Sequence, residues 1–432
     1  MSGIVQSNIV RSSGTIAVAA SGLNWDSAVI TASTLTAEGG KGYFINTTSN
    51  ICTITLPSAA ETGDQIVFVD YARTWGTYKI VIDSNGLNYQ GDNDTFIVEY
   101  NTSGETLDIV YSGASKGWIP QNDDVVVDAP VAPPTQKAIF GFGNLNGGSN
   151  TGISNLVNSS GVVQSDTSAV GSARSALGAV TYGGDKALFA FGSGPVNNAV
   201  VNRRNLVNNN GVISSNASGA GTAREYIGGA EYGGDKAIFA FGTTASSQTN
   251  VSNLVSNSGV VASDTSGVGL VRAYGAGVRF GVGKAIFGFG QAAGVGITGI
   301  TNLVSDQGVV AANTSAVGTA REYVAAAAYG SDKGVFGFGR VAGGRTAITN
   351  KVSNTGVVAS DTSGVGTVRQ YIAGTNFGGD NGIFGFGSTA DGNTNGTGIT
   401  NKVNNQGVVA ANTAAVATAR IYVAGAGYSF SA

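Results

Sequence analysis

A seven-residue segment, Lys-Ala-Ile-Phe-Gly-Phe-Gly at 137–143, recurs five more times along the chain with small changes. The later copies begin at Lys186, Lys236, Lys284, Lys333 and Asn381. Successive copies lie 49, 50, 48, 49 and 48 residues apart, counted between their first Phe residues. A period of this length, built on short strands, is typical of propellers and solenoids. The repeat therefore constrains the fold of residues 137–432 more than any other feature.

Each copy is short, apolar and bounded by Gly, which favours a strand that is buried on both faces. Phe alternates with Gly or Ala within the copy. Because side chains alternate across a strand, the bulky residues share one face and the small residues share the other. We expect the small face to accommodate Phe rings from a neighbouring sheet.

The rest of each repeat keeps a constant order. An Asn-Leu-Val or Asn-Lys-Val strand follows, then a turn ending in Gly, a Gly-Val-Val or Gly-Val-Ile strand, a polar turn, and a last strand opened by Arg. The Asn residues are Asn155, Asn205, Asn253, Asn302, Asn350 and Asn401, and the Arg residues are Arg174, Arg224, Arg272, Arg321, Arg369 and Arg420. Four strands per repeat is the content of a propeller blade.

The ends of the array complement each other. The first five Arg residues each precede the next central Phe by 15, whereas Arg420 has no such Phe after it and Phe140 has no such Arg before it. We therefore expect the last strand, around 421–429, to pair with 137–143 and close a ring, which leaves no unpaired end. The sequence predicts a six-bladed β-propeller.

Residues 1–120 do not share the repeat and hold all three Trp residues. Short apolar runs separated by turn signals predict an antiparallel β-sandwich. The expected strands are 42–46, 52–56, 65–70, 79–83, 95–100, 106–111 and 118–120. Residues 121–136 are rich in Pro and Asp and predict a linker. The chain is thus expected to be all-β, with a module at 1–120, a linker at 121–136 and a propeller at 137–432.

Composition excludes several function classes. The net charge is −3 without a basic block, so nucleic acid is not an expected partner. The absence of His removes the commonest general base and metal ligand, and no cofactor is expected. Cys52 lies in an apolar run and is interpreted as a core residue. The first residues lack the apolar core of a secretory signal, and no segment has the length of a membrane span, so we expect assembly in a cytoplasm without membrane insertion.

Two recurring charged positions have alternative interpretations. The six Arg residues would either line a channel that binds an anion or serve each blade by bonding a neighbouring blade, and the second is favoured because every repeat carries one. Asp166, Asp264 and Asp361 occupy the polar turn in alternate repeats. Calcium binding needs several oxygen ligands, whereas each turn provides one carboxylate. An Asx turn is enough to explain Asp at this position.

Length variation is confined to one loop. The spacing from Asn to Arg is 19 in all six repeats, whereas the spacing from Phe to Asn ranges from 14 to 17. Equivalent loops share one face of a propeller, and insertions on one face often mark a binding surface. The candidate binding residues in these loops are Asn146, Asn150, Asn198, Arg203, Arg340, Arg345, Asp391 and Asn393.

Residues 40–119 resemble a β-sandwich module of tail-fibre and other virion proteins of marine and cyanobacterial phages. The resemblance is carried by GKGYFINTTS at 40–49, TITLPSAAETGDQIVFVDYARTW at 53–75, Asn85-Gly86 and LDIVYSGASKGWI at 107–119. It implies a role in virion structure and contacts with other virion proteins through 1–120. It also implies assembly as a homo-oligomer, although the chain contains no coiled-coil heptads.

The repeats are similar to kelch-type propellers in their order of Arg, Gly-Gly turn and apolar strand ending in Gly. They differ from kelch in having no blade Trp and no Gly-Gly after the apolar strand. The FGFG segments with GVVASDTSGVGTVR at 356–369 also resemble phage virion repeats.

These resemblances imply a phage virion structural protein, a tail or head fibre whose propeller contacts a glycan or protein receptor on the host. The alternatives are a decoration protein without a receptor and a glycan-degrading enzyme. The absence of His and of sialidase-type S-x-D-x-G-x-x-W boxes favours a protein without catalytic activity.

Overall fold

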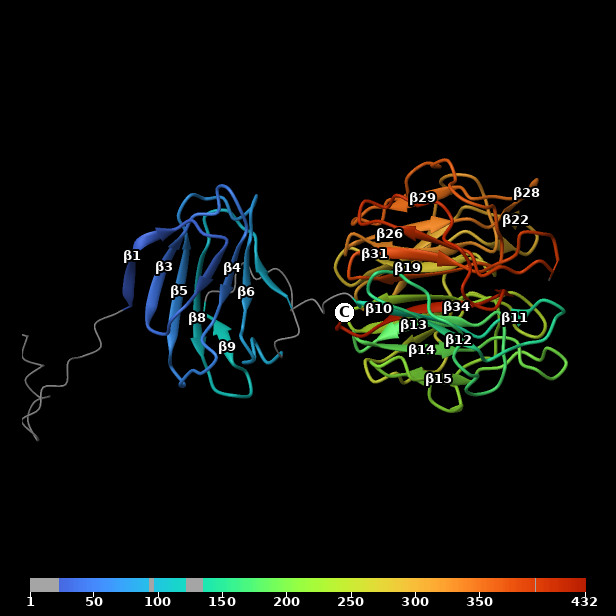
Figure 1. Ribbon diagram of the computed structural model, residues 1–432, viewed down its shortest axis with the longest axis horizontal. Helices are drawn as coiled ribbons and strands as arrows, with labels where there is room; N and C mark the ends of the chain where they lie inside the picture. The colour runs from blue at the N-terminus through green and yellow to red at the C-terminus, as the bar shows by residue number, and fades with distance from the viewer. Residues whose placement is uncertain (1–22, 93–96, 122–134, 393) are drawn as a thin grey trace, which may run out of the picture. The chain divides into compact units, whose positions relative to one another are not determined.

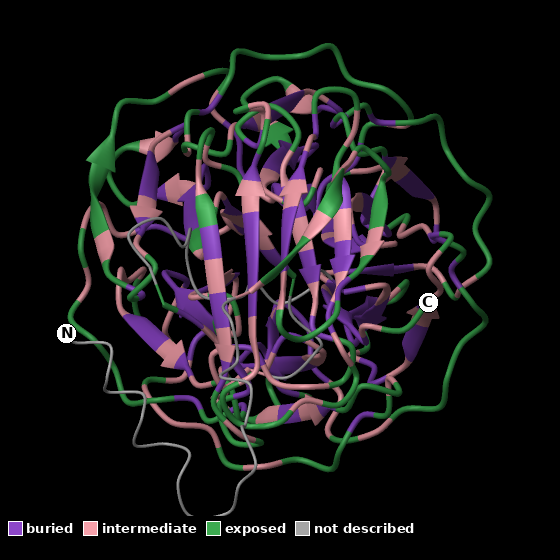
Figure 2. Cartoon of the chain, turned by 90° about the vertical axis from the view of Figure 1, so that its left-hand side faces the viewer, coloured by how far each residue is buried: buried purple, intermediate pink, exposed green. Residues whose placement is uncertain are grey.

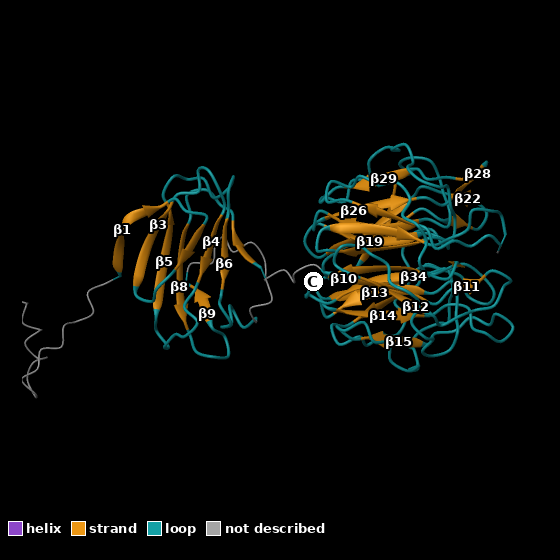
Figure 3. Cartoon of the chain, in the orientation of Figure 1, coloured by secondary structure: helices purple, strands orange, loops and turns teal. Residues whose placement is uncertain are grey.

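The computed structural model describes residues 23–92, 97–121, 135–392 and 394–432. These residues form strands and turns and contain no helix, so the chain is all-β (Figures 1 and 3). They accordingly offer no helix with the length and hydrophobicity to cross a bilayer. The chain divides into two compact units, 1–132 and 133–432, and each is described separately. The expected linker at 121–136 falls mostly outside the described residues.

The first unit contains two sheets. Sheet A has the order β1 (Asn24–Ile30), β3 (Lys41–Ile45), β5 (Gln65–Asp70), β8 (Thr106–Tyr111) and β9 (Trp118–Pro120). Sheet B has the order β2 (Thr34–Thr36), β4 (Cys52–Thr55), β6 (Ile80–Asp83) and β7 (Val98–Tyr100). Part of the expected strand at 95–100 lies outside the described residues.

The expectation of purely antiparallel sheets is wrong. β1, β3 and β5 pair in parallel, as do β2, β4 and β6, and only β7, β8 and β9 pair antiparallel. The cause is the chain path, since β1 to β6 alternate between sheets A and B. Each return to a sheet therefore follows two reversals of direction, which makes sequential strands of that sheet parallel.

One core is shared by sheets A and B. It contains Tyr43 and Phe68 from sheet A and Ile54 and Ile80 from sheet B. Trp75 and Trp118 are fully buried in it, while Trp25 is largely exposed. Cys52 is buried in the same core, and burial raises the pKa of its thiol to about 11, so the interpretation of Cys52 as a core residue is confirmed.

Glu105 gives the first unit a pH-dependent stability. Its Oε2 is buried without a hydrogen-bond partner, and burial raises the pKa of the carboxyl to about 7, with Asp70 adding to the rise. A carboxyl with a raised folded-state pKa favours folding below its unfolded pKa of 4.5, and this contribution is lost as the pH rises through 7.

We expect Glu105→Gln to increase the free energy of unfolding of this unit by about 1–2 kcal/mol at pH 8, after allowance for partial solvent screening. At pH 4.5 the change is expected to be close to zero. Urea unfolding followed by Trp fluorescence measures this, because all three Trp residues belong to the first unit. Equal effects at both pH values would contradict the prediction.

The second unit contains six sheets, numbered 1 to 6, and three small ribbons. Sheet 1 has the order β12 (Ser154–Val157), β10 (Lys137–Gly141), β34 (Ala424–Tyr428), and sheet 2 has the order β13 (Gly178–Tyr182), β14 (Lys186–Ala190), β15 (Arg204–Val207). Sheet 3 has the order β16 (Gly228–Tyr232), β17 (Lys236–Ala240), β18 (Ser252–Val255), and sheet 4 has the order β19 (Ala276–Phe280), β20 (Lys284–Gly288), β23 (Thr301–Val304), β24 (Val310–Thr314). Sheet 5 has the order β25 (Ala325–Tyr329), β26 (Lys333–Gly337), β29 (Thr349–Val352), and sheet 6 has the order β30 (Ala373–Phe377), β31 (Asn381–Gly385), β32 (Thr400–Val403). The ribbons pair β11 (Asn144–Leu145) with β33 (Arg420–Ile421), β21 (Gln291–Ala292) with β22 (Gly296–Ile297), and β27 (Arg340–Val341) with β28 (Gly344–Arg345).

The repeated apolar segment forms the central strand of every sheet. Its small residues accept Phe rings from the next sheet, as the sequence predicted. A Cβ added at Gly141 would lie 2.8 Å from the Phe189 ring, and one at Gly385 would lie 3.3 Å from the ring of Phe140. The last sheet therefore packs against the first in the same way as other neighbours do.

The first and last strands of the second unit pair within sheet 1. β34 pairs antiparallel with β10, with Ala138 opposite Gly427 and Phe140 opposite Gly425. The strand before each central strand contacts its counterpart in the next sheet, and β34 contacts both β30 and β13. Buried residues predominate in these strands. Exposed residues lie in the peripheral turns (Figure 2).

Five of the six sheets have three strands where the sequence predicted four. The Gly-Val-Val segment makes only isolated bridges in these sheets, such as Val157 to Val163 and Ser154 to Thr167. The two bridges enclose one more residue on the outer segment than on β12, so the ladder is interrupted by a bulge. The Asn155 side chain occupies this interruption and donates to Gln164 O and Asp166 Oδ1. Only β24 in sheet 4 extends into a full fourth strand.

Candidate ligand-binding face

Five tyrosines gather where the innermost strands begin. Each follows the recurring Arg of its repeat by two residues, and the first repeat has Ala at this place. The residues of this tyrosine cluster are Tyr226, Tyr274, Tyr323, Tyr371 and Tyr422, and the sixth position is Ala176. All six positions have φ between 53° and 65°, the left-handed region that bulky residues rarely adopt. Such backbone strain persists only where the surroundings enforce it.

The rings of the tyrosine cluster touch one another. Successive ring centroids from Tyr226 to Tyr422 are 4.2 to 4.6 Å apart, and Tyr226 and Tyr422 are 5.4 Å apart across Ala176. Backbone bonds link the same residues, since Tyr226 N donates to Ala176 O and Ala176 N donates to Tyr422 O. The cluster thus joins residues from all six repeats in one closed series.

Most of the cluster remains partly exposed. Tyr371 is 8% exposed, and the other four side chains are more accessible. Burial raises the pKa of the Tyr226, Tyr274, Tyr323 and Tyr422 phenols above their usual range. The phenols therefore stay neutral at physiological pH and present an aromatic surface with hydrogen-bonding oxygens.

Buried arginines hold the backbone that carries the tyrosines. Each of the six guanidinium groups stacks on a Phe ring of one sheet, 4.0 to 5.0 Å from the centroid, and donates to an Asn of the next sheet. Arg174, for example, stacks on Phe142 and donates to Asn205 Oδ1 at 2.7 Å. Arg420 stacks on Phe386 and donates to Asn155, which links sheet 6 to sheet 1.

The two interpretations of these arginines are thereby separated. All six side chains are 0–1% exposed, and burial lowers the pKa of each to about 10. Guanidinium groups with this little exposure are not accessible to a soluble anion. The arginines connect sheets, and the alternative of an anion-binding channel is wrong.

The aspartates of the polar turns also bond to protein. Asp264 accepts the Thr222 amide N–H and hydroxyl, and it accepts the Asn253 amide N–H as well. Asp361 and Asp166 make the equivalent bonds with Thr319 and Thr418. Among the residues with assigned structure, no group of three acidic, His or Cys side chains could hold a metal ion.

The loops of variable length begin beside the tyrosine cluster. The residue before each cluster position bridges to the start of a loop, as in Glu225 with Thr243 and Glu322 with Arg340. The ribbon strands β11, β22 and β28, which belong to these loops, lie at the same end of the unit, on the right in Figure 1. We call the tyrosine cluster together with these loops the loop face.

Four of the predicted binding residues connect neighbouring loops. Asn146 Oδ1 accepts Gly396 N–H at 2.7 Å, and Asn150 Nδ2 donates to Ser193 O at 3.2 Å. Arg345 Nη1 forms an ion pair with Asp391 at 2.7 Å. These side chains therefore hold the loops against one another around the face, and only part of their hydrogen-bonding capacity remains for a ligand.

The other predicted residues are dispersed. Arg340 pairs with the buried Glu322 at 3.2 Å, next to Tyr323. Asn198 is exposed at a loop tip. Arg203 is exposed and donates to Ser172 Oγ, which does not belong to the tyrosine cluster. Asn393 lies outside the described residues.

The sequence reasoning missed the tyrosines themselves. A signal was available, because Tyr follows the Arg by two residues in five of the six repeats. A large aromatic residue at constant register near a strand start is normally assigned to the core. Only the geometry shows these rings converging at the end where the loops begin.

Comparisons of the sequence with models of known protein families and with curated proteins gave no match.

Proposed function

We propose that residues 137–432 form a six-bladed β-propeller closed by β34 and that residues 1–120 form a β-sandwich. The support for the propeller is the antiparallel pairing of β34 with β10 and the return of the series of strand contacts to β13. The Arg420 bond to Asn155 repeats across this junction the link found between the other sheets. The support for the sandwich is the single core shared by sheets A and B.

We further propose that the protein is a phage virion structural protein, a tail or head fibre without catalytic activity whose loop face binds the host surface. The observation that carries this proposal is the partly exposed tyrosine cluster at the end where the variable loops begin. Aromatic faces with polar edges recur at binding surfaces because they provide apolar contact and hydrogen bonds at small entropic cost.

A cell-surface glycan fits this surface best. Sugar rings present C–H faces that stack on tyrosine, and their hydroxyls bond to amides and carboxylates such as those of Asn146 and Asp391. The phenols are neutral, which suits an uncharged sugar. A protein receptor is the second candidate, because clustered tyrosines also occur at protein interfaces.

The virion assignment is drawn from the resemblance of residues 40–119 to virion modules. On this proposal the first unit attaches to other virion proteins, the protein forms a homo-oligomer on the particle, and assembly takes place in the host cytoplasm. A decoration protein would share the first unit but would not need an exposed aromatic face. A glycan-degrading enzyme would need a carboxylate pair acting on a bound sugar.

Tyr323→Ala is the sharpest test of the loop face, because Tyr323 contacts all four other rings of the cluster. We expect roughly tenfold weaker binding of the full-length chain to host cells or to its ligand on a glycan array, from the loss of one aromatic stacking contact. Tyr323→Phe keeps the ring and is expected to retain most of the binding.

Tyr78→Ala is the matched control, since Tyr78 is an exposed tyrosine of the first unit. Equal binding by Tyr323→Ala and Tyr78→Ala, with both variants folded by circular dichroism, would contradict the proposed receptor face.

A further inference from the structure

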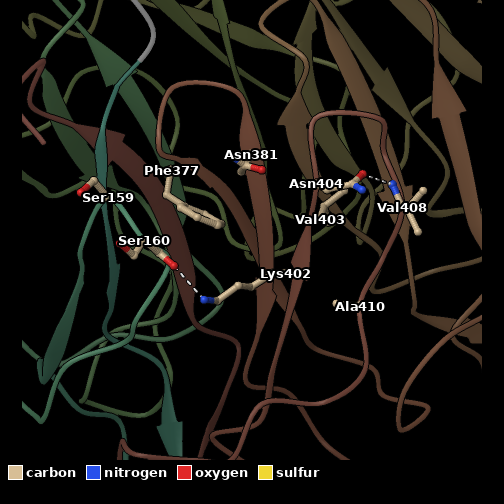
Figure 4. Close-up of a pocket in the computed structure, with 9 residues that line it drawn as sticks. All are labelled: Ser159, Ser160, Phe377, Asn381, Lys402, Val403, Asn404, Val408 and Ala410. Carbon is tan, nitrogen blue, oxygen red and sulfur yellow. Dashed lines mark hydrogen bonds between the residues drawn. The ribbon is translucent and has the colours of Figure 1, made fainter.

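A hollow lies at the opposite end of the sheets from the loop face. It has a volume of about 410 Å³ and lies between sheet 6 and the turn that follows β12 of sheet 1 (Figure 4). Its lining includes Phe377, Asn381, Lys402, Asn404 and Ser160. Since the loops follow Gly385 at the end of β31 and Asn381 begins that strand, the two sites occupy opposite strand ends. We call this hollow the seam pocket.

An equivalent hollow of about 250 Å³ lies between sheets 1 and 2, where Lys137 and Tyr428 are retained, and the repeat explains why the seam pocket is larger. Position 381 is the first residue of the central strand, where the other five repeats have Lys. Its partner in the adjacent strand is Phe377, where four of the other five repeats have Tyr. Sheet 6 alone combines the shorter Asn with a ring that lacks a hydroxyl, and both changes remove atoms from the same place.

The seam pocket contains a cation without an acidic partner. Lys402 Nζ donates to Ser160 O at 2.7 Å and lies 6.0 Å from the centroid of the Phe377 ring (Figure 4). Within the described part of the chain, no carboxylate lies within ion-pair distance of Lys402. An ammonium ion has three donors, so two remain for a ligand.

The remaining lining combines polar groups with an apolar floor. Asn404 Oδ1 accepts Val408 N–H, which leaves its amide N–H groups available as donors. Asn381 donates to Asp380 Oδ1 and keeps its own Oδ1 as an acceptor. Val408 and Ala410 complete the lining with apolar surface.

We propose that the seam pocket binds a small sugar acid through its carboxylate. The carboxylate pairs with Lys402, the hydroxyls bond to the side-chain amides of Asn381 and Asn404, and the ring lies against the apolar floor. A volume of about 410 Å³ suits a ligand of one or two sugar units. This site is independent of the loop face, so each can fail without the other.

Isothermal titration of the full-length protein with D-glucuronate tests the proposal, with D-glucose as the uncharged control. We expect a dissociation constant of roughly 1 mM for glucuronate, because a ligand this small provides few contacts. Glucose is expected to bind at least tenfold more weakly. Failure of glucuronate to bind, or equal binding of glucose, would overturn the proposal.

Two variants locate the binding. Lys402→Met removes the cation and is expected to weaken glucuronate binding at least tenfold. Asn381→Lys restores the residue of the other repeats and is expected to narrow the pocket, as Lys137 does in the equivalent hollow of about 250 Å³, and to weaken glucuronate binding. This lysine should find a partner in Asp380, as Lys186 and Lys333 do in Asp185 and Asp332, so the variant is expected to fold.

Lys351→Met provides the matched control. Lys351 occupies the equivalent position in sheet 5 and donates to Gln406 O at 2.8 Å, but its groove retains Lys333 and Tyr329. The Lys351→Met variant therefore loses the same kind of lysine-to-carbonyl bond between sheets as Lys402→Met, but it leaves the seam pocket unchanged. Binding within twofold of the parent is expected for Lys351→Met and for Tyr323→Ala. Equal losses in Lys351→Met and Lys402→Met would overturn the proposed site.

Discussion

Removal of residues 423–432 is expected to abolish the folding of the second unit while the first unit still folds. The deletion takes away β34 and leaves one edge of β10 unpaired. Ala424, Ala426 and Tyr428 leave the core that they share with Phe189. The lost burial and strand pairing are on the order of 5–10 kcal/mol, which equals the whole stability of a typical domain.

The two units can be followed separately. Trp fluorescence reports on the first unit, because the second has no Trp. Far-UV circular dichroism and size exclusion report on the second unit, which provides most of the strands. We expect the truncated chain to keep the Trp unfolding transition and to lose the remaining β signal or aggregate through the exposed edge.

Two further chains make the test specific to β34. Deletion of 430–432 alone leaves the strand intact and is expected to have little effect. A permuted chain that carries residues 420–428 before Lys137, joined by a Gly-Gly turn like that between Tyr182 and Lys186, is expected to fold. A truncated chain with an unchanged second unit would show that sheet 1 does not need its third strand.

The repeat located the apolar strands β10, β14, β17, β20, β26 and β31 because its constraints are local and periodic. The constant spacing from Asn to Arg now has a physical reason. Asn155 accepts from Arg420 and fills the bulge near Asp166, while Arg174 reaches the Asn of the next sheet. An insertion between the two residues would break this network, which recurs in every repeat, whereas the bonds made by the loops before the Asn differ from one repeat to the next.

The first unit was harder to predict because its pairing is non-local. The apolar runs located Gln65–Asp70, Thr106–Tyr111 and Trp118–Pro120 at their observed bounds. The pairing partner of a strand depends on which of the two sheets the chain enters after each turn. The alternation of apolar and polar residues does not indicate which sheet that is. β1 and β2 were missed because most of their residues are exposed and lack a clear apolar alternation.

The candidate site likewise combines features that the local sequence predicts with contacts between residues that are distant in the sequence. Loop length identified the variable segments, and the structure shows that Asn146, Asn150, Arg345 and Asp391 mainly join loops to one another. The tyrosine cluster is visible only in the structure, because its members lie roughly 50 positions apart in the sequence and come into contact on folding.

Arg272→Met is expected to destabilise the second unit by about 2–4 kcal/mol. Arg272 is 1% exposed, stacks on Phe241 at 4.0 Å and donates to Asn302 Oδ1 at 2.6 Å. Met fills much of the volume, but it leaves a buried amide oxygen without its donor and a ring without its cation. The measurement is urea unfolding followed by circular dichroism at about 218 nm, where β-sheets have a negative band.

Arg203→Met is the control, because the Arg203 side chain is exposed and donates to the Ser172 hydroxyl, while its backbone bond to Phe191 is kept in the variant. A change within about 0.5 kcal/mol is expected for an exposed position of this kind. Because Arg272 lies two residues before Tyr274, its loss should also release the strained backbone at Tyr274, which has φ of 65°. We therefore expect Arg272→Met to weaken ligand binding at the loop face even in conditions where the unit remains folded. Equal stability of the two variants would show that the recurring arginines are not what holds neighbouring sheets together.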